Sequence, residues 1–92
     1  MWVEVPGTNK KAKVVLYALS TCPWCKRTKK LLNDNAVAYR YVDVDLLSGD
    51  EEDGIINEIS KLNPMQSFPT VVINGQVIAG FQEGRIREML GL

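Results

Sequence analysis

The two cysteines, Cys22 and Cys25, are the residues of this chain best suited to covalent chemistry, and they lie three positions apart within Ser20–Lys26. The apolar run Val14–Leu19 precedes them and favours a strand, whereas apolar residues after Pro23 recur at helical spacing. Pro23 therefore falls in the first turn of a helix, where proline needs no N–H and its fixed φ suits the helix. We expect the pair to lie where a strand turns into a helix.

Cys22 is expected to be the reactive sulfur of the pair. A cysteine at a helix N-terminus lies beside unpaired N–H groups and the positive end of the helix dipole, which favour thiolate over thiol. Its pKa can fall to roughly 3.5–7.5, from about 8.5 for a free thiol. Cys25 lies one turn deeper on the same face, so we expect it to be less exposed and to stay protonated to higher pH. This asymmetry suits disulfide exchange, in which one thiolate attacks and a nearby thiol resolves the mixed disulfide.

Three other uses of the cysteines agree less well with the sequence. A zinc site needs about four ligands, and the chain has two cysteines and no histidine. A structural disulfide that closes two residues removes little chain entropy. Two unrelated buried thiols are the third alternative. The spacing, together with the strand, the proline and the helix, favours a redox pair.

The segment Thr21-Cys22-Pro23-Trp24-Cys25 resembles the active site of the glutaredoxins, which usually carry tyrosine where this chain has Trp24. The likeness spans roughly residues 13–91. It implies a dithiol-disulfide oxidoreductase that reduces protein disulfides. In this reaction Cys22 attacks, Cys25 resolves, and another donor then reduces the oxidised pair.

The resemblance also implies a substrate surface around the cysteines. Phe68-Pro69 matches the cis-proline position of thioredoxin-like folds, where the backbone N–H and C=O of Phe68 are free to pair with a substrate segment. Trp24 is expected at the surface, whereas Phe81 belongs either to the core or to an apolar rim of the site. The expected substrate-binding residues are Thr21, Pro23, Trp24, Phe68, Pro69 and Phe81.

Two departures from the glutaredoxin pattern bear on the electron donor. Leu19 stands where many glutaredoxins carry a cation that meets glutathione, and Ala79–Glu83 replaces a Gly-Gly-x-x-Asp segment. Loss of a charge-assisted contact costs about 1.5–3 kcal/mol, or roughly 10–150-fold in affinity, so we expect glutathione to be a weak co-substrate. Gly80-Phe81 instead resembles the redoxins that serve ribonucleotide reductase and are recharged by a thioredoxin-reductase-type flavoenzyme.

We therefore expect a disulfide reductase as donor, with a glutathione-dependent glutaredoxin as the main alternative. An iron–sulfur cluster carrier is a further alternative, disfavoured by the stiff Pro23 and the missing glutathione contacts. A binding module with inert thiols is the last. No resident cofactor or metal is expected.

Composition limits the broader possibilities. With 92 residues, of which 46% are hydrophobic, the chain suffices for one small core, so we expect a single domain over 1–92. Eleven basic and eleven acidic residues cancel, which leaves no electrostatic footprint for nucleic acid or an anionic membrane. Residues 1–12 show no signal-peptide core, and no apolar run is long enough for a membrane span. We expect a cytoplasmic monomer.

Periodicity predicts an α/β fold of thioredoxin-like (glutaredoxin) type. Helices are expected over 23–33, from Ser48 to Leu62, and up to Leu90, and a strand over 38–45. Asn74-Gly75 predicts a hairpin between the last two strands. Because a helix joins the first two strands of the redox domain, they should be parallel with a right-handed crossover. The result is a four-stranded mixed sheet flanked by three helices, with residues 1–12 either a flexible extension or an extra strand in a hairpin onto residues 13–19.

Several local features have competing interpretations. Ser48 and Glu51 predict a capping box for the second helix, whose apolar stripe is Ile55, Ile56, Ile59 and Leu62. Lys26 and Lys29 lie along the cysteine face, where they either stabilise the thiolate or simply complement the helix dipole in water. Asp43 and Asp45 are interpreted as turn residues and not as metal ligands.

Overall fold

The computed structural model describes residues 1–92. Five strands form one sheet in the order β1-β3-β2-β4-β5, so that β2 is central. The strands are β1 (Val3–Val5), β2 (Val14–Ala18), β3 (Tyr39–Asp43), β4 (Thr70–Ile73) and β5 (Gln76–Ala79). The helices are α1 (Pro23–Asp34), the 3-10 turn η1 (Val44–Leu46), α2 (Gly49–Leu62) and α3 (Glu83–Leu90). No helix is both long and apolar enough to span a membrane.

The sheet is mixed, as the sequence predicts. β2 and β3 are parallel and are joined through α1, whereas β4 pairs antiparallel with both β2 and β5. The β4–β5 hairpin turns at Asn74 and Gly75, both with positive φ (50° and 83°), a conformation that Asn-Gly favours. The thioredoxin-like fold and its hairpin are thus confirmed.

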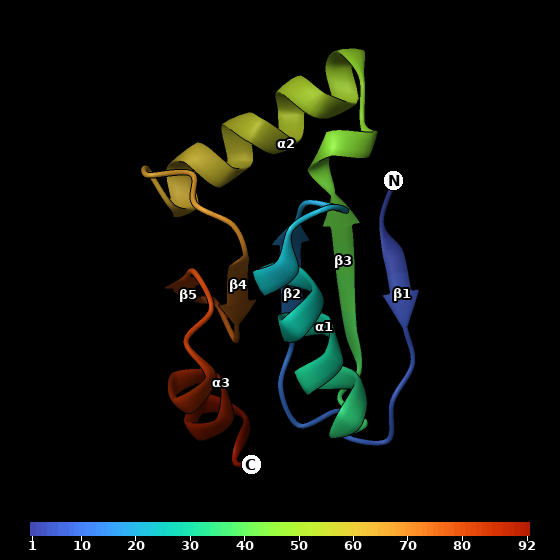
Figure 1. Ribbon diagram of the computed structural model, residues 1–92, viewed down its shortest axis with the longest axis vertical. Helices are drawn as coiled ribbons and strands as arrows, with labels where there is room; N and C mark the ends of the chain where they lie inside the picture. The colour runs from blue at the N-terminus through green and yellow to red at the C-terminus, as the bar shows by residue number, and fades with distance from the viewer.

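Two hydrophobic layers cover the two faces of the sheet. One face packs against α1 and α3 through Leu16, Leu32 and Ile86, all fully buried. The other face packs against α2, where Val42 and Ile59 meet. In Figure 1, α1 and α3 lie in front of the sheet and α2 runs across its upper end. We call the two layers the α1 layer and the α2 layer. The side chains of β3 alternate between them: Tyr39 and Tyr41 pack in the α1 layer, and Val42 packs in the α2 layer.

The N-terminal segment forms a strand, but its partner is not the one expected. β1 pairs antiparallel with β3, not as a hairpin onto residues 13–19. The physical reason is that β3 and β4 already occupy both edges of β2, so β1 can pair only at an outer edge of the sheet, and it takes the edge of β3. Gly7 permits the segment after β1 to lie close against the segment before β3, because a Cβ at Gly7 would lie 2.3 Å from the carbonyl oxygen of Ala36.

Three local predictions need correction. Ser48 is at the N-cap of α2 but makes no capping hydrogen bond, because the chain enters the helix through Gly49 at φ +60° and a capping box needs a helical first residue. Ile56 is exposed, so the buried stripe of α2 is narrower than predicted. The third strand ends at Asp43, and Val44 begins the 3-10 turn η1, where it is still buried in the α2 layer.

Candidate active site

The two cysteines lie at the carboxyl end of the central strand, where the sequence places them. Cys22 is the N-cap of α1 with an extended backbone (φ −80°, ψ 118°), and Pro23 is the first helical residue. The Sγ of Cys22 accepts a hydrogen bond from the backbone N–H of Cys25 at 3.2 Å. A sulfur that accepts from a helix N-terminus is held where negative charge is favoured.

Cys25 differs from Cys22 in its environment. Cys22 is half-buried, whereas Cys25 has no exposed surface. Burial is the largest influence on the Cys25 thiol and raises its pKa to about 12; a hydrogen bond with Cys22 acts in the same direction. The predicted difference in depth is confirmed, and Cys25 is held as the protonated thiol at neutral pH.

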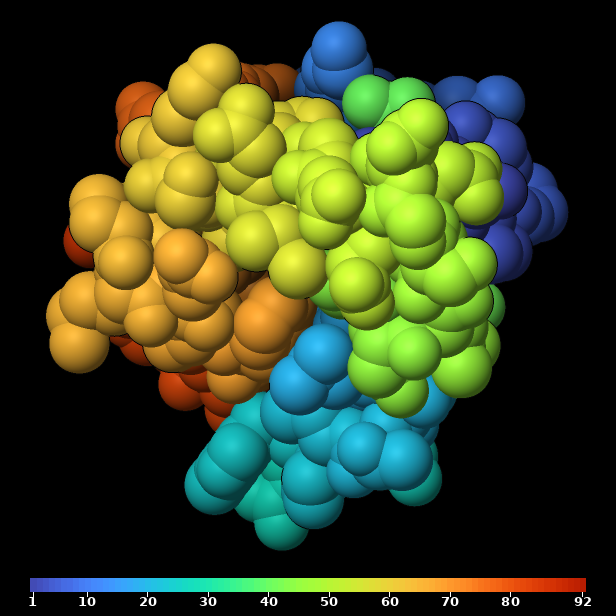
Figure 2. Space-filling view, turned by 90° about the horizontal axis from the view of Figure 1, so that it is seen from above, coloured from blue at the N-terminus to red at the C-terminus, as the bar shows by residue number.

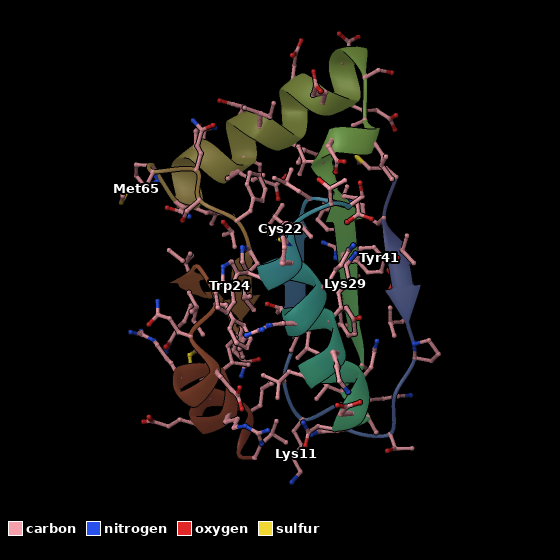
Figure 3. All side chains as sticks on the ribbon, viewed as in Figure 1. Lys11, Cys22, Trp24, Lys29, Tyr41 and Met65 are labelled. Atoms are coloured by element: carbon pink, nitrogen blue, oxygen red, sulfur yellow. The ribbon has the colours of Figure 1, made fainter.

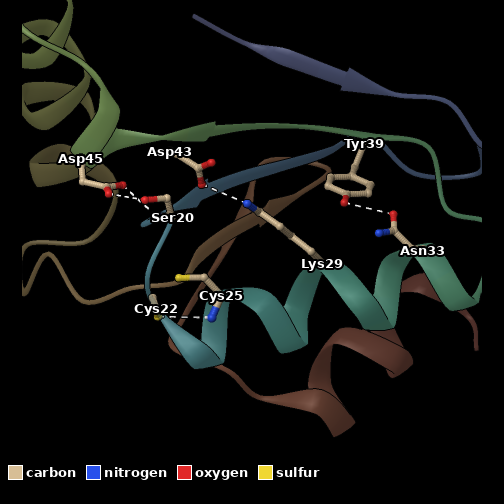
Figure 4. A network of polar contacts seen from close by, with 8 residues as sticks. All are labelled: Ser20, Cys22, Cys25, Lys29, Asn33, Tyr39, Asp43 and Asp45. Atoms are coloured by element: carbon tan, nitrogen blue, oxygen red, sulfur yellow. Dashed lines mark hydrogen bonds and ion pairs between the residues drawn. The ribbon is translucent and has the colours of Figure 1, made fainter.

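The loop that carries Cys22 is tied to the turn after β3. The carboxylate of Asp45 accepts from the backbone N–H of Ser20 at 2.7 Å and also from the Ser20 hydroxyl. These two bonds hold the pKa of the Asp45 carboxyl below its ordinary value. Figure 4 shows that they anchor the chain two residues before Cys22.

A second contact joins α1 to β3 one turn further along the helix. The ammonium of Lys29 lies 3.0 Å from Oδ1 of Asp43, and both side chains are largely buried, with 21% and 15% of their surface exposed. The ammonium also lies 4.0 Å from the centre of the Tyr41 ring, and Figure 3 shows the two side chains together. Lys29 therefore does not simply extend into water, whereas Lys26 is exposed.

An aromatic pair borders the cysteines on the α3 side. Trp24 is 51% exposed, as predicted. Its ring stacks on that of Phe81, with centroids 5.7 Å apart and planes inclined by 26°. The guanidinium of Arg27 lies 4.8 Å from the Trp24 ring centre. Phe81 is half-buried and also packs against the α1 layer, so it belongs to both the core and the rim.

The segment between α2 and β4 supplies the opposite border. The Phe68-Pro69 bond is cis, Pro69 is buried, and Phe68 packs against both hydrophobic layers. Neither the N–H nor the C=O of Phe68 takes part in a hydrogen bond within the chain. In Figure 2 the segment near residues 20–25, in blue to cyan, meets residues 65–70, in orange, and the start of α2, in green, at a shallow hollow.

A buried polar cluster holds this segment in place. The amide nitrogen of Asn63 donates to Oγ of Ser67 at 3.0 Å and to Oγ1 of Thr70 at 3.1 Å. The Thr70 hydroxyl in turn donates to the carbonyl of Ser67 at 2.7 Å. Asn63 and Thr70 are both buried, so the cluster fixes the ends of the segment that carries Phe68.

The structure brings the predicted site residues together at one end of the sheet. Thr21 and Pro23 are exposed beside Cys22, and the aromatic and cis-proline borders lie on either side. Sequence reasoning missed the Ser20–Asp45 bonds and the Asn63 cluster, and left the role of Lys29 open. The available signal was the position of Asp43 and Asp45 at the end of a strand parallel to β2, since parallel strands end at the same edge.

Comparison with known proteins agrees with this geometry. Residues 14–78 match the family model described as Glutaredoxin. A glutaredoxin-like 8.6 kDa protein in the rubredoxin operon of Clostridium pasteurianum is 30% identical over 77 residues, which cover 84% of this chain and 96% of that protein.

Solved structures show the same likeness. The glutaredoxin of Methanosarcina mazei Go1 is 49% identical with a TM-score of 0.87, over 99% of this chain and 88% of that one. The methanoredoxin of Methanosarcina acetivorans is 52% identical with a TM-score of 0.82, over 87% of this chain and 85% of that one.

Proposed function

The chain belongs to the glutaredoxin family of thiol-disulfide oxidoreductases, and from that premise we propose that it reduces protein disulfides through Cys22 and Cys25 with a disulfide reductase as its donor. The observation that carries the assignment of the two sulfurs is the hydrogen bond from the N–H of Cys25 to Sγ of Cys22. It supports Cys22 as the attacking sulfur, because a group that accepts from a helix N-terminus lies where negative charge is favoured.

The proposed reaction has two exchange steps. The Cys22 thiolate attacks a target disulfide, forms a mixed disulfide and releases the first target thiolate, which takes up a proton. Cys25 then loses its proton and attacks Sγ of Cys22, which releases the second target thiol and leaves the Cys22–Cys25 disulfide. Two electrons and two protons from the donor restore both thiols.

The surface around Cys22 supports a polypeptide substrate. The free N–H and C=O of Phe68 offer an extended segment the pairing of an added strand. Trp24, half exposed and held by Phe81, offers an apolar contact on the other side of the sulfur. Because Gly80-Phe81 resembles the redoxins that serve ribonucleotide reductase, that enzyme is a candidate target.

The donor is proposed from the residues that stand where glutathione contacts are expected. Leu19 is apolar and packs against the α2 layer, so it offers no charge to a carboxylate. Phe81, in the segment that departs from the Gly-Gly-x-x-Asp pattern of the family, stacks on Trp24. Both features weaken glutathione binding and favour recharging by a reductase protein.

A two-donor assay tests the proposal. Reduction of a protein disulfide is followed with glutathione and its reductase, and separately with a thioredoxin reductase system. We expect turnover mainly with the second. Fast turnover with glutathione alone overturns the donor assignment, and no turnover with either system overturns the proposed activity.

A further inference from the structure

The resolving step poses an electrostatic problem that the two cysteines alone do not solve. Cys25 is fully buried, and burial opposes the thiolate that must attack the mixed disulfide. A nearby positive charge is the usual means of stabilising a buried anion.

Lys29 supplies a cation on the correct face of α1. It follows Cys25 by four residues, a spacing that places the two side chains on one side of the helix with Cβ atoms about 5–6 Å apart. Figure 4 shows both side chains between α1 and the sheet. The Lys29 ammonium is held there by Asp43 at 3.0 Å and by the Tyr41 ring at 4.0 Å.

The groups that act on the Cys25 sulfur are few. Cys22, on the same helix, raises the pKa of the thiol by its hydrogen bond and by its charge, whereas the N–H of Leu19 and the Lys29 ammonium lower it. Asp43, from β3, accepts a hydrogen bond from the Lys29 ammonium and is not among the groups that shift the pKa of Cys25. Lys29 also lowers the pKa of the Asp45 carboxyl, to a smaller extent than the hydrogen bonds from Ser20 do.

We propose that Lys29 is a positioning residue for the second exchange step, in which its ammonium stabilises the Cys25 thiolate as that thiolate attacks Sγ of Cys22. The inference rests on the proposed function. The bond between Cys22 and the target sulfur breaks, the Cys22–Cys25 bond forms, and the proton from Cys25 passes through solvent to the released target thiolate. Lys29 itself neither gains nor loses a proton. Asp43 fixes the ammonium but partly offsets its charge.

The size of the effect follows from two opposing trends. Each unit by which the pKa of a thiol rises reduces its thiolate fraction tenfold at a pH below that pKa. The more basic thiolate is also more nucleophilic, with a Brønsted coefficient of about 0.4–0.5. The net slowing is therefore about threefold to fourfold for each unit by which the pKa of the thiol rises.

Stopped-flow reaction of the reduced protein with 2,2′-dipyridyl disulfide separates the two steps, because each step releases one absorbing thiopyridone. Lys29→Met is expected to slow the second release between pH 6 and 8, by about threefold to fourfold for each unit by which it raises the pKa of Cys25, and to leave the first release unchanged. Lys29→Arg retains the charge and should restore the second release. Lys30→Met is the matched control, since Lys30 is exposed and pairs only with Asp34.

Asp43→Asn distinguishes an electrostatic role from a structural one. This substitution keeps the Oδ1 that accepts from the Lys29 ammonium and removes only the offsetting charge. If Lys29 acts by its charge, Asp43→Asn therefore leaves the second release equally fast or faster. If the ion pair merely holds α1 on the sheet, Lys29→Met and Asp43→Asn slow it alike, and that result overturns the proposal. An unchanged second release in Lys29→Met also overturns it.

Should Lys29→Met fail to fold, Asp43→Asn decides alone: a slower second release contradicts the proposal, and an equal or faster one supports it. Absence of the first release in the unmodified protein contradicts the proposed function instead.

Discussion

Thr70→Val, which replaces a buried hydroxyl by a methyl group, is expected to lower the free energy of unfolding. Thr70 belongs to the Asn63 cluster that holds the segment carrying Phe68. The side chain keeps its size, so no cavity forms. The hydroxyl it loses both donates to the carbonyl of Ser67 and accepts from the amide of Asn63, and the residue has no exposed surface. The Ser67 carbonyl and the Asn63 amide keep their contacts with each other, at 3.3 Å to the carbonyl and 3.0 Å to Oγ, so the loss is that of two hydrogen bonds. Each is worth about 0.5–1.5 kcal/mol, so the expected cost is about 1–3 kcal/mol.

Thr28→Val is the matched control. Thr28 is equally buried, but its hydroxyl donates to the carbonyl of Trp24 four residues earlier. In an α-helix that carbonyl already accepts the backbone N–H of Thr28, so its loss leaves no acceptor unpaired. We expect Thr28→Val to change the free energy of unfolding by less than about 0.5 kcal/mol.

Urea unfolding followed by tryptophan fluorescence measures the difference. For a loss of about 2 kcal/mol and an m-value near 2 kcal/mol/M, the midpoint of Thr70→Val falls by roughly 1 M. The corresponding fall in Tm is roughly 8–16 °C. Equal effects of the two substitutions, or no effect of Thr70→Val, would refute the role given to the cluster.

Three further predictions concern the site itself. Cys25→Ser should stop the reaction at a mixed disulfide on Cys22, seen as an added mass that dithiothreitol removes; continued turnover of protein disulfides by this variant would contradict the resolving role. Trp24→Ala should lower kcat/KM for a protein disulfide about threefold to tenfold while Cys22 alkylation stays unchanged, and an unchanged kcat/KM would exclude Trp24 from substrate contact. Because Ser20 lowers the folded pKa of Asp45, the stability that Asp45 contributes is present above the unfolded pKa of about 4 and is lost as pH falls below it. The difference in urea midpoint between the unmodified protein and Asp45→Asn should therefore shrink from pH 6 to pH 3; a constant difference would mean that the carboxylate charge is not what holds Ser20.

Much of the fold could be predicted because its signals are local. Apolar periodicity marks the helices and strands, Asn74-Gly75 marks the hairpin, and Pro23 marks the start of α1. The partner of β1 could not be predicted, since it depends on which sheet edge the rest of the fold leaves free. The capping box failed because a glycine at the helix entry allows a backbone that the pattern of side chains does not reveal.

In the candidate site, too, the features with local signals could be predicted and the contacts between distant residues could not. Pro23 and the three-residue spacing place Cys22 and Cys25 correctly relative to the helix, because both cysteines lie within one turn of its start. Ser20 and Asp45 are 25 residues apart, and Lys29 and Asp43 are 14 apart. Such contacts depend on how β2 and β3 are aligned, and no local pattern determines that alignment.

The central claim is that the start of α1 makes the Cys22 sulfur reactive, whereas burial keeps Cys25 protonated and out of reach of reagents in solvent. Brief exposure of the reduced, folded protein to iodoacetamide at pH 7, followed by peptide mass spectrometry, tests it directly. We predict that Cys22 is carboxamidomethylated and that Cys25 reacts only after unfolding. Equal labelling of both cysteines, or preferential labelling of Cys25, would contradict the account.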